Sequence, residues 1–258
     1  MNKVTQKLNE NKFLFSELVK RDFKKKYKNT YLGMIWSILS PLLTLLIMHL
    51  VFSNFFGRNQ AHFTIYLFCG NIVFSYFSDS TSGGMGSLLG NAGIFTKVNV
   101  PKYLFLFSRN VSSLINFGLT LIVFFIFCII DGITFAWSFF LLIFPIMCMI
   151  VFNIGIGLIL SALFVFFRDM KYLWSVFTQL LMYMSAIFYP VTTFPEAAQK
   201  FFLLNPVYVY IKYFRLIVID NTIPSLPYHL LALGYAILAF GIGALIYKKC
   251  NHKFLYYV

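Results

Sequence analysis

The sequence predicts an all-α membrane protein with six transmembrane helices. Hydrophobic residues make up 60% of the 258 residues and charged residues only 11%, whereas soluble domains carry about 25% charged residues. The apolar residues also fall in runs of roughly 20, which is the length that a helix needs to cross about 30 Å of hydrocarbon. We therefore expect residues 1–258 to form a single transmembrane domain.

Residues 1–32 predict a helix that lies in the plane of the membrane interface. Leu14, Leu18 and Phe23 recur at helical spacing between residues 11 and 28, and charged side chains occupy the other side. This pattern is typical of an amphipathic interface helix. Because no apolar core is followed by a small-residue cleavage site, we expect no secretory signal.

Residues 33–189 predict the first five spans. Pro41 favours a kink in the first span, because its ring and missing N–H disturb a helix. The loop at residues 82–102 is rich in Gly and Asn and encloses one short helical candidate around residues 87–97. The five expected spans are residues 33–56, 63–79, 103–130, 138–167 and 172–189, with polar turns at residues 58–62 and 168–171.

Residues 203–219, within the segment 190–227, look long enough to cross the membrane, but their charges argue against a simple span. Lys212 and Arg215 would lie mid-bilayer at a cost of about 2.5 to 3.5 kcal/mol each. We therefore expect an outer re-entrant or interfacial helical pair, a gate segment broken by prolines, since irregular backbone at depth needs cover from protein or water. The last span follows at residues 228–247 and a basic tail at 248–258.

The distribution of positive charge predicts that both termini are cytoplasmic. Six spans place both termini on one side, and 17 of the 21 Lys and Arg residues fall on that side. The other side holds only Arg58, Lys200, Lys212 and Arg215. The net charge of +13 is therefore better explained by the positive-inside rule and anionic lipid than by nucleic acid.

The residues that could act in catalysis or bind a metal form no cluster in the sequence. The carboxylates between spans fall in different loops on both faces, and the four histidines form no pair of metal ligands at helical spacing. No phosphate-binding loop occurs, because the Gly and Lys residues of GNAGIFTK at 90–97 have the wrong spacing. We expect no catalytic residue, metal or cofactor in this chain, so that ATP and Mg²⁺ would belong to a partner chain.

Several segments together resemble the membrane subunits of type-2 bacterial ABC exporters for polysaccharide (of the O-antigen or capsule kind) or teichoic acid. The resemblance begins with a basic segment that precedes Leu-Gly, an aromatic residue and proline. The matching residues are Arg21-Asp22-Phe23-Lys24, Tyr27-Lys28, Leu32-Gly33, Trp36 and Pro41, then FTKVNVP at 95–101, Phe167-Arg168-Asp169, Tyr189-Pro190 and Asn205-Pro206. Together these segments cover nearly the whole chain in order.

The resemblance implies a homodimer in the bacterial inner (plasma) membrane, driven by two nucleotide-binding ATPase subunits. The dimer would form a channel for a glycan linked to a polyprenyl pyrophosphate lipid. Cationic side chains at the level of the lipid headgroups would attract that pyrophosphate, although simple anchoring to anionic membrane lipids explains them equally well. These residues are Arg21, Lys24, Lys25, Lys26 and Lys28.

The resemblance also assigns a coupling helix, and residue type alone suggests a group of pathway aromatics. The short helix in the loop after the second span would couple to the ATPase through Asn91, Phe95 and Lys97, or it is an ordinary surface turn. Aromatic side chains could line the pathway by stacking on sugar rings, although packing explains any single one of them. These channel or gate residues are Trp36, Phe74, Tyr76, Phe188 and Tyr189.

Small residues in two spans predict close helix contacts, namely Gly155 with Gly157 and Ala239 with Gly243. Alternative functions for the whole chain are an exporter of teichoic acid or of a small lipophilic drug, a membrane-embedded enzyme that modifies glycans, and a passive channel.

Overall fold

The computed structural model describes residues 3–28, 30–56, 62–98 and 100–257. This described part is all-helical, at 81% helix and without a strand, as the sequence predicts. The expected turn around Arg58 and the residue Asn99 of the FTKVNVP segment lie outside the described residues.

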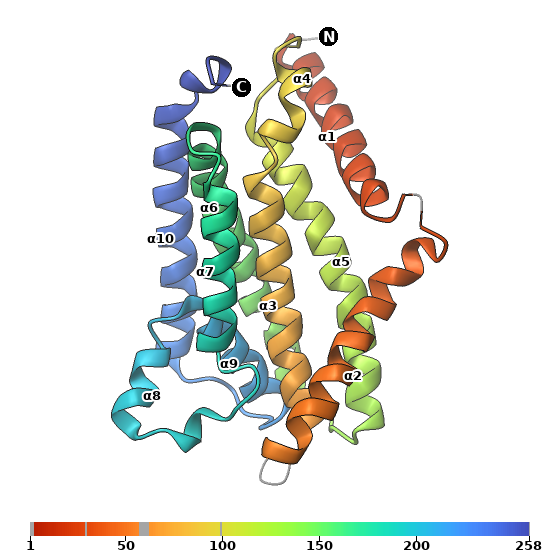
Figure 1. The fold of residues 1–258 in the computed structure, drawn as a ribbon, viewed down its shortest axis with the longest axis vertical. Helices are drawn as coiled ribbons and strands as arrows, with labels where there is room; N and C mark the ends of the chain where they lie inside the picture. The colour runs from red at the N-terminus through yellow and green to blue at the C-terminus, as the bar shows by residue number, and fades with distance from the viewer. Residues whose placement is uncertain (1–2, 29, 57–61, 99, 258) are drawn as a thin grey trace.

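Long helices run side by side in one bundle, and both termini lie at the same end of it (Figure 1). The helix α1 leans away from the bundle, and α8 lies at the end opposite the termini. The helices are α1 (Lys3–Tyr27), α2 (Trp36–Phe56), α3 (Phe63–Met85), α4 (Ala92–Phe95), α5 (Tyr103–Ile130), α6 (Ile143–Phe166), α7 (Met170–Met184), α8 (Glu196–Phe202), α9 (Pro206–Val218) and α10 (Leu226–Cys250). Short 3₁₀ segments lie at Gly33–Ile35 (η1), Leu89–Asn91 (η3), Trp137–Leu142 (η4), Val191–Thr193 (η5) and Lys253–Leu255 (η6).

Among the residues that the structure describes, four segments are long and apolar enough to cross a membrane, or five if α8 and α9 count as one broken span. The four are Gly33–Ser53, Tyr103–Ile130, Trp137–Phe166 and Leu226–Cys250, and each coincides with an expected span. The count of six spans is therefore not confirmed, because α3 and α7 are not among them.

The helix α7 is shorter than the expected span at residues 172–189. It ends at Met184, and Ala186 adopts a left-handed conformation with φ of 49° that turns the chain. Its 15 residues give a length of about 22 Å, which falls short of the hydrocarbon thickness. The sequence offers no glycine or proline at this turn, so hydropathy alone overestimated the helix.

The helix α3 differs in the opposite direction, since it continues to Met85 rather than ending near Asp79. Its last turns are polar, and Ser80, Thr81 and Gly84 among them are buried. Ser80 donates a hydrogen bond to Asn110 of α5, and a side chain at Gly84 would come within 3.2 Å of the Gly157 Cα of α6. Small polar residues thus extend this helix because they permit close packing.

The helices α6 and α10 approach each other at Gly155. A Cβ atom at this position would lie 2.6 Å from the main-chain oxygen of Ala239, and a Cβ at Gly243 would overlap the main-chain oxygen of Gly155. No substituted residue fits at such separations without a shift of backbone. The predicted close contact between these small residues is confirmed.

The segment expected to be re-entrant forms α8 and α9, whose axes differ by 106° across a short break. Asn205 caps α9 by accepting a hydrogen bond of 3.0 Å from Val207 N, and Pro206 follows at the first helical position. The bend fits either a broken span or a re-entrant loop, so the re-entrant placement stays a prediction.

Arg215 of α9 is 7% exposed and ties three segments together. Its guanidinium donates to the main-chain oxygens of Ala186 (2.9 Å), Ile187 (3.1 Å) and Tyr66 (3.2 Å). It also stacks on the Tyr66 ring at 3.4 Å. The charge that argued against a simple span is therefore held inside the protein by carbonyl dipoles rather than exposed to lipid.

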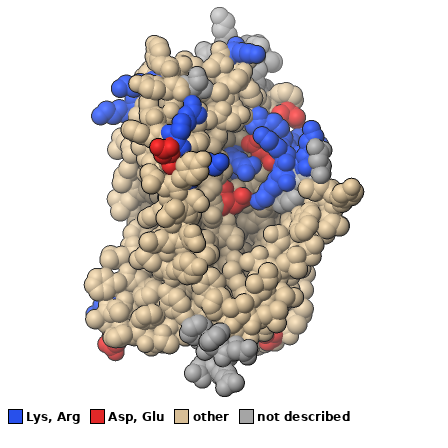
Figure 2. Space-filling model, viewed as in Figure 1, with Lys and Arg blue, Asp and Glu red and all other residues tan. Residues whose placement is uncertain are grey.

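Charge divides the molecule into two halves. Figure 2 shows Lys and Arg gathered in the half that carries both termini, above all over α1, while the opposite half is almost entirely uncharged on this face. This separation agrees with the count from the sequence, and it gives the bundle one basic end.

Candidate functional site

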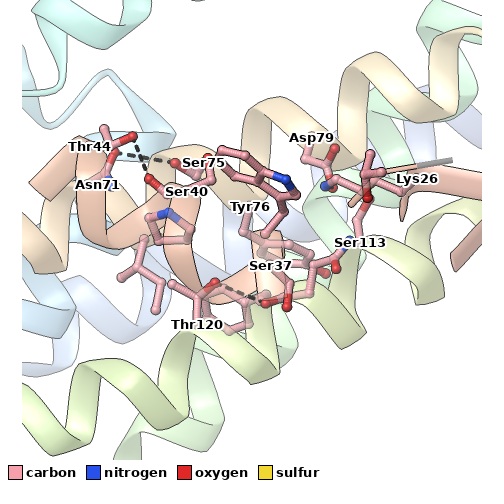
Figure 3. Close-up of a pocket in the computed structure, with 16 residues that line it drawn as sticks. Lys26, Ser37, Ser40, Thr44, Asn71, Ser75, Tyr76, Asp79, Ser113 and Thr120 are labelled. Atoms are coloured by element: carbon pink, nitrogen blue, oxygen red, sulfur yellow. Dashed lines mark hydrogen bonds and ion pairs between the residues drawn. The ribbon is translucent and has the colours of Figure 1, made fainter. Parts of the chain in front are cut away.

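A cavity of about 450 Å³ lies between α2, α3 and α5 and is shown in Figure 3. It reaches from the end of α1 down into the apolar bundle. The residues that line it are Lys26, Thr30, Trp36, Ser37, Ser40, Pro41, Thr44, Asn71, Ile72, Ser75, Tyr76, Asp79, Ser113, Asn116, Phe117 and Thr120. Most of them are polar, which is unusual at this depth in an apolar helical protein.

The polar lining is built from three helical rows. Residues three or four apart share one face of a helix, and each of the three helices presents such a row to the cavity. The rows are Ser37, Ser40 and Thr44 on α2, then Asn71, Ser75 and Asp79 on α3, and Ser113, Asn116 and Thr120 on α5. Each row is inconspicuous in its own span, and only the packing of the three helices brings them together.

Several hydroxyl protons of the cavity are already used. Ser37 donates to Met34 O at 2.6 Å, Thr44 to Ser40 O at 2.9 Å, and Thr120 to Asn116 O at 3.0 Å. A hydroxyl that donates to its own helix keeps its oxygen lone pairs as acceptors. The cavity therefore offers hydrogen-bond acceptors to a ligand that is rich in O–H groups.

An ion pair lies at the basic end of the cavity. Lys26 Nζ of α1 is 3.1 Å from Asp79 Oδ2 of α3, and each side chain is about one third exposed. A pair as accessible as this contributes about 0–1 kcal/mol to stability. Its position, where the interface helix meets the bundle, matters more than its energy.

The five expected pathway aromatics do not form one group. Trp36 and Tyr76 line the cavity, where the Tyr76 ring stacks on Phe117 with centroids 4.6 Å apart. Phe188 stacks on Phe52 at 4.7 Å, and the Phe74 ring lies 6.1 Å from that of Phe77. The fifth, Tyr189, donates a hydrogen bond to Tyr183 O. Only two of the five therefore share this cavity.

The expected headgroup residues lie at the end of α1. Lys24, Lys25, Lys26 and Lys28 are exposed. Arg21 instead donates to Asp22, at 3.0 Å from Nε and 2.7 Å from Nη2 to Oδ1. The cluster is thus an exposed basic surface with one internal ion pair.

The short helix expected around residues 87–97 is present as η3 and α4, and its coupling role stays a prediction. One of its three named side chains is exposed. Phe95 is 5% exposed and packs near Phe105, and Asn91 is 7% exposed. Lys97 is exposed and is the residue of the three whose side chain is open to a partner. Phe95 and Asn91 instead support the helix from the inside.

Lys102 joins this region to the C-terminal end. Its ammonium group donates to Asn251 O at 2.8 Å and lies over the rings of Phe95 and Phe254, at 5.8 and 5.6 Å from their centroids. Burial lowers the pKa of Lys102 from its usual value. These contacts hold α4 against the C-terminal residues Asn251 and Phe254.

Sequence reasoning missed most of the cavity-lining residues, among them Asn71, Ser75, Ser113 and Thr120. A signal was available, because polar residues that recur every three or four positions in an apolar span predict a polar stripe. The described residues contain no group of three His, Cys, Asp or Glu side chains that could hold a metal ion.

Comparisons with known proteins agree with this architecture. Residues 14–219 match the family model described as ABC-2 type transporter. The chain is 31% identical over 121 residues to the O-antigen export system permease protein RfbA of Myxococcus xanthus, a match that covers 47% of this chain and 46% of that protein. It is 26% identical over 253 residues to the O-antigen export system permease protein RfbA of Klebsiella pneumoniae, covering 94% of this chain and 95% of that protein.

Proposed function

This chain belongs to the ABC-2 type transporter family, and on that premise we propose that it is the membrane subunit of an ATP-driven polysaccharide exporter. The cargo would be an O-antigen-like glycan on polyprenyl pyrophosphate, moved across the bacterial inner membrane. Support comes from the K. pneumoniae relative named as an O-antigen export permease, which matches this chain over 94% of its length.

Membership of the family implies that an ATPase subunit works with this chain. The proposal adds that two copies of this chain assemble with two ATPase subunits, which hold ATP and Mg²⁺. The exposed faces of α2 and α7 support a second copy, because only 11% of the α2 span is buried within one chain. The basic end, with both termini, would face the cytoplasm and the ATPase, and Lys97 is the exposed candidate for that contact.

The acceptor-lined cavity is the observation that carries the proposal. A sugar polymer presents many O–H donors, and the oxygens of Ser37, Thr44 and Thr120 offer them acceptors within an apolar bundle. A small lipophilic drug has few O–H donors, so these hydroxyl oxygens would give it few hydrogen bonds. Teichoic acid, which also carries hydroxyl groups, remains the alternative cargo.

Removing the acceptors tests this role of the cavity. We expect the double variant Thr44→Val/Thr120→Val to lower glycan export severalfold, because valine keeps the shape and removes two oxygens. Thr178→Val is the matched control, since Thr178 of α7 also donates to its own helix, at Trp174 O, and does not line the cavity. Cells depleted of the native chain would be complemented with each variant, and both lipid-linked glycan inside and glycan at the surface would be measured.

Trapped glycan in the depleted cells supports the exporter. Restoration of surface glycan by Thr178→Val but not by the double variant supports the role of the cavity. Normal surface glycan in the double variant would remove the cavity from the transport pathway. Trapped teichoic acid instead of polysaccharide would reassign the cargo.

The basic surface at the end of α1 leads to a second prediction. Replacing Lys24, Lys25, Lys26 and Lys28 together by Gln should impair export without preventing insertion, because an exposed cationic cluster attracts anionic headgroups by about 1 kcal/mol per residue. Changing Lys248 and Lys249 to Gln at the end of α10 is the control for general loss of basic charge. Unchanged glycan delivery by the quadruple variant would contradict a role in recruiting the lipid-linked substrate.

A further inference from the structure

A second cavity, of about 430 Å³, lies where α1 crosses the ends of α3 and α5. It is separate from the polar cavity described above, although Lys26 lines both. The residues that line it are Arg21, Asp22, Lys25, Lys26, Ser82, Gly83, Gly86, Ser87, Gly90, Asn91, Phe105 and Arg109.

The charges around this cavity do not balance. Of the described residues that line it, four are cationic and one, Asp22, is a carboxylate. Asp22 is also engaged within the protein, because its Oδ1 accepts from Arg21 and its Oδ2 lies 3.1 Å from the Ser108 hydroxyl. Lys26 faces Asp79. Within the described part of the chain this leaves Lys25 and Arg109 without an ion pair.

Arg109 is held in the cavity wall by its passage over Gly83. A Cβ atom at position 83 would lie 2.5 Å from Arg109 Nε and 2.9 Å from its Cγ. Only glycine leaves room for the side chain in this orientation. The end of α3 therefore restricts the orientation of the Arg109 side chain, which would otherwise be free to move.

Asn91 provides an independent observation. Its side chain is 7% exposed and lines the same cavity. Its Nδ2 donates to Ser87 O at 2.7 Å, but its Oδ1 has no partner. Because a buried acceptor without a partner costs about 1–3 kcal/mol, the cavity suits a ligand that brings a donor as well as negative charge.

We propose that this cavity binds a phosphoryl group, with Arg109 and Lys25 as its cationic contacts. Arginine favours phosphate because its planar fork donates two parallel hydrogen bonds. Asn91 Oδ1 would accept from a hydroxyl group beside the phosphate. The phosphoryl group belongs either to a lipid headgroup or to a soluble phosphate. Only the further step of identifying that lipid with the exported one rests on the proposed function.

Binding of radiolabelled inorganic pyrophosphate to the full chain in phosphatidylcholine nanodiscs tests the site. We expect saturable binding that Arg109→Gln weakens about tenfold, the effect of one charge-assisted contact worth roughly 1.4 kcal/mol. Gly83→Ala should weaken it similarly with the charge unchanged, because the added methyl group displaces Arg109. Arg168→Gln is the control for loss of an arginine charge, since Arg168 donates to Tyr257 O and does not line the cavity.

Nanodiscs that also contain phosphatidic acid separate the two sources of phosphate. If a lipid headgroup reaches the cavity, pyrophosphate binding falls in these discs, and the fall is smaller in Arg109→Gln; if it does not, the site takes soluble phosphate. Thermal melting of each variant confirms that it is folded.

Equal pyrophosphate affinity in Arg109→Gln, Gly83→Ala and native chain would overturn the proposal. The proposal would also be overturned if Arg109→Gln kept its affinity for pyrophosphate but no longer bound the ATPase subunit. In that case the cavity would accept an acidic side chain of the partner protein rather than a phosphoryl group. If Arg109→Gln no longer binds pyrophosphate but glycan export is normal, the phosphoryl site is supported. Its ligand is then not the exported lipid. Absence of trapped glycan on depletion would refute the proposed function and leave the binding result standing.

Discussion

Gly155→Ala is expected to separate α6 from α10 and to destabilise the chain by roughly 1–3 kcal/mol, the usual cost of overpacking. In a helix interior alanine is normally better than glycine by about 1 kcal/mol, so helix propensity predicts the opposite sign. The clash decides, because the new Cβ would meet main-chain atoms of Ala239 and Phe240. Main-chain atoms cannot rotate away as the end of a side chain can.

Gly241→Ala is the matched control for this prediction. Gly241 lies on α10, and a Cβ there would meet nothing within 4 Å. Its substitution should be neutral or slightly stabilising through propensity alone. Thermal melting of both variants in the same detergent measures the difference, and equal melting temperatures would show that the two helices can separate without loss.

Arg215→Met is expected to loosen α9 from the bundle, with a loss of about 2–4 kcal/mol. The variant removes the donor that serves the oxygens of Ala186 and Ile187, and an unsatisfied buried carbonyl costs about 1–3 kcal/mol. Arg215→Lys should recover only part of the loss, because an ammonium group lacks the flat fork that reaches several oxygens and stacks on a ring. The Arg215 guanidinium therefore stabilises the fold through several directed hydrogen bonds and ring stacking rather than through an ion pair.

Lys212→Met, three residues earlier on α9, separates this effect from a general loss of charge. The Lys212 ammonium lies 5.2 Å from the centroid of the Tyr228 ring and makes no ion pair within the described residues. We expect Lys212→Met to lower the stability by less than about 1 kcal/mol, because a partly exposed cation over an aromatic ring contributes at most about that much. Trypsin cleavage at Lys200 and the melting temperature report the release of α8 and α9, and equal losses in the two variants would rule out the carbonyl clamp.

The site was predicted only in part, because its residues come from helices far apart in the sequence. Trp36 and Tyr76 were expected as pathway aromatics and Lys26 as a headgroup contact, and all three line the polar cavity. Their partners Asn71 and Thr120 carried no motif. Phe188 and Tyr189 were grouped with them by residue type, but the turn at Ala186 places them elsewhere.

The sequence by itself determined the features that depend on composition and local order. Four spans, the basic end and the small residues between α6 and α10 could be predicted, because hydropathy, charge and side-chain size act over one helix at a time. Tertiary structure alone decided where α7 stops, how Arg215 is satisfied, and which polar rows share a cavity. These depend on atoms brought within a few ångströms by packing of distant segments, and no single segment contains that information.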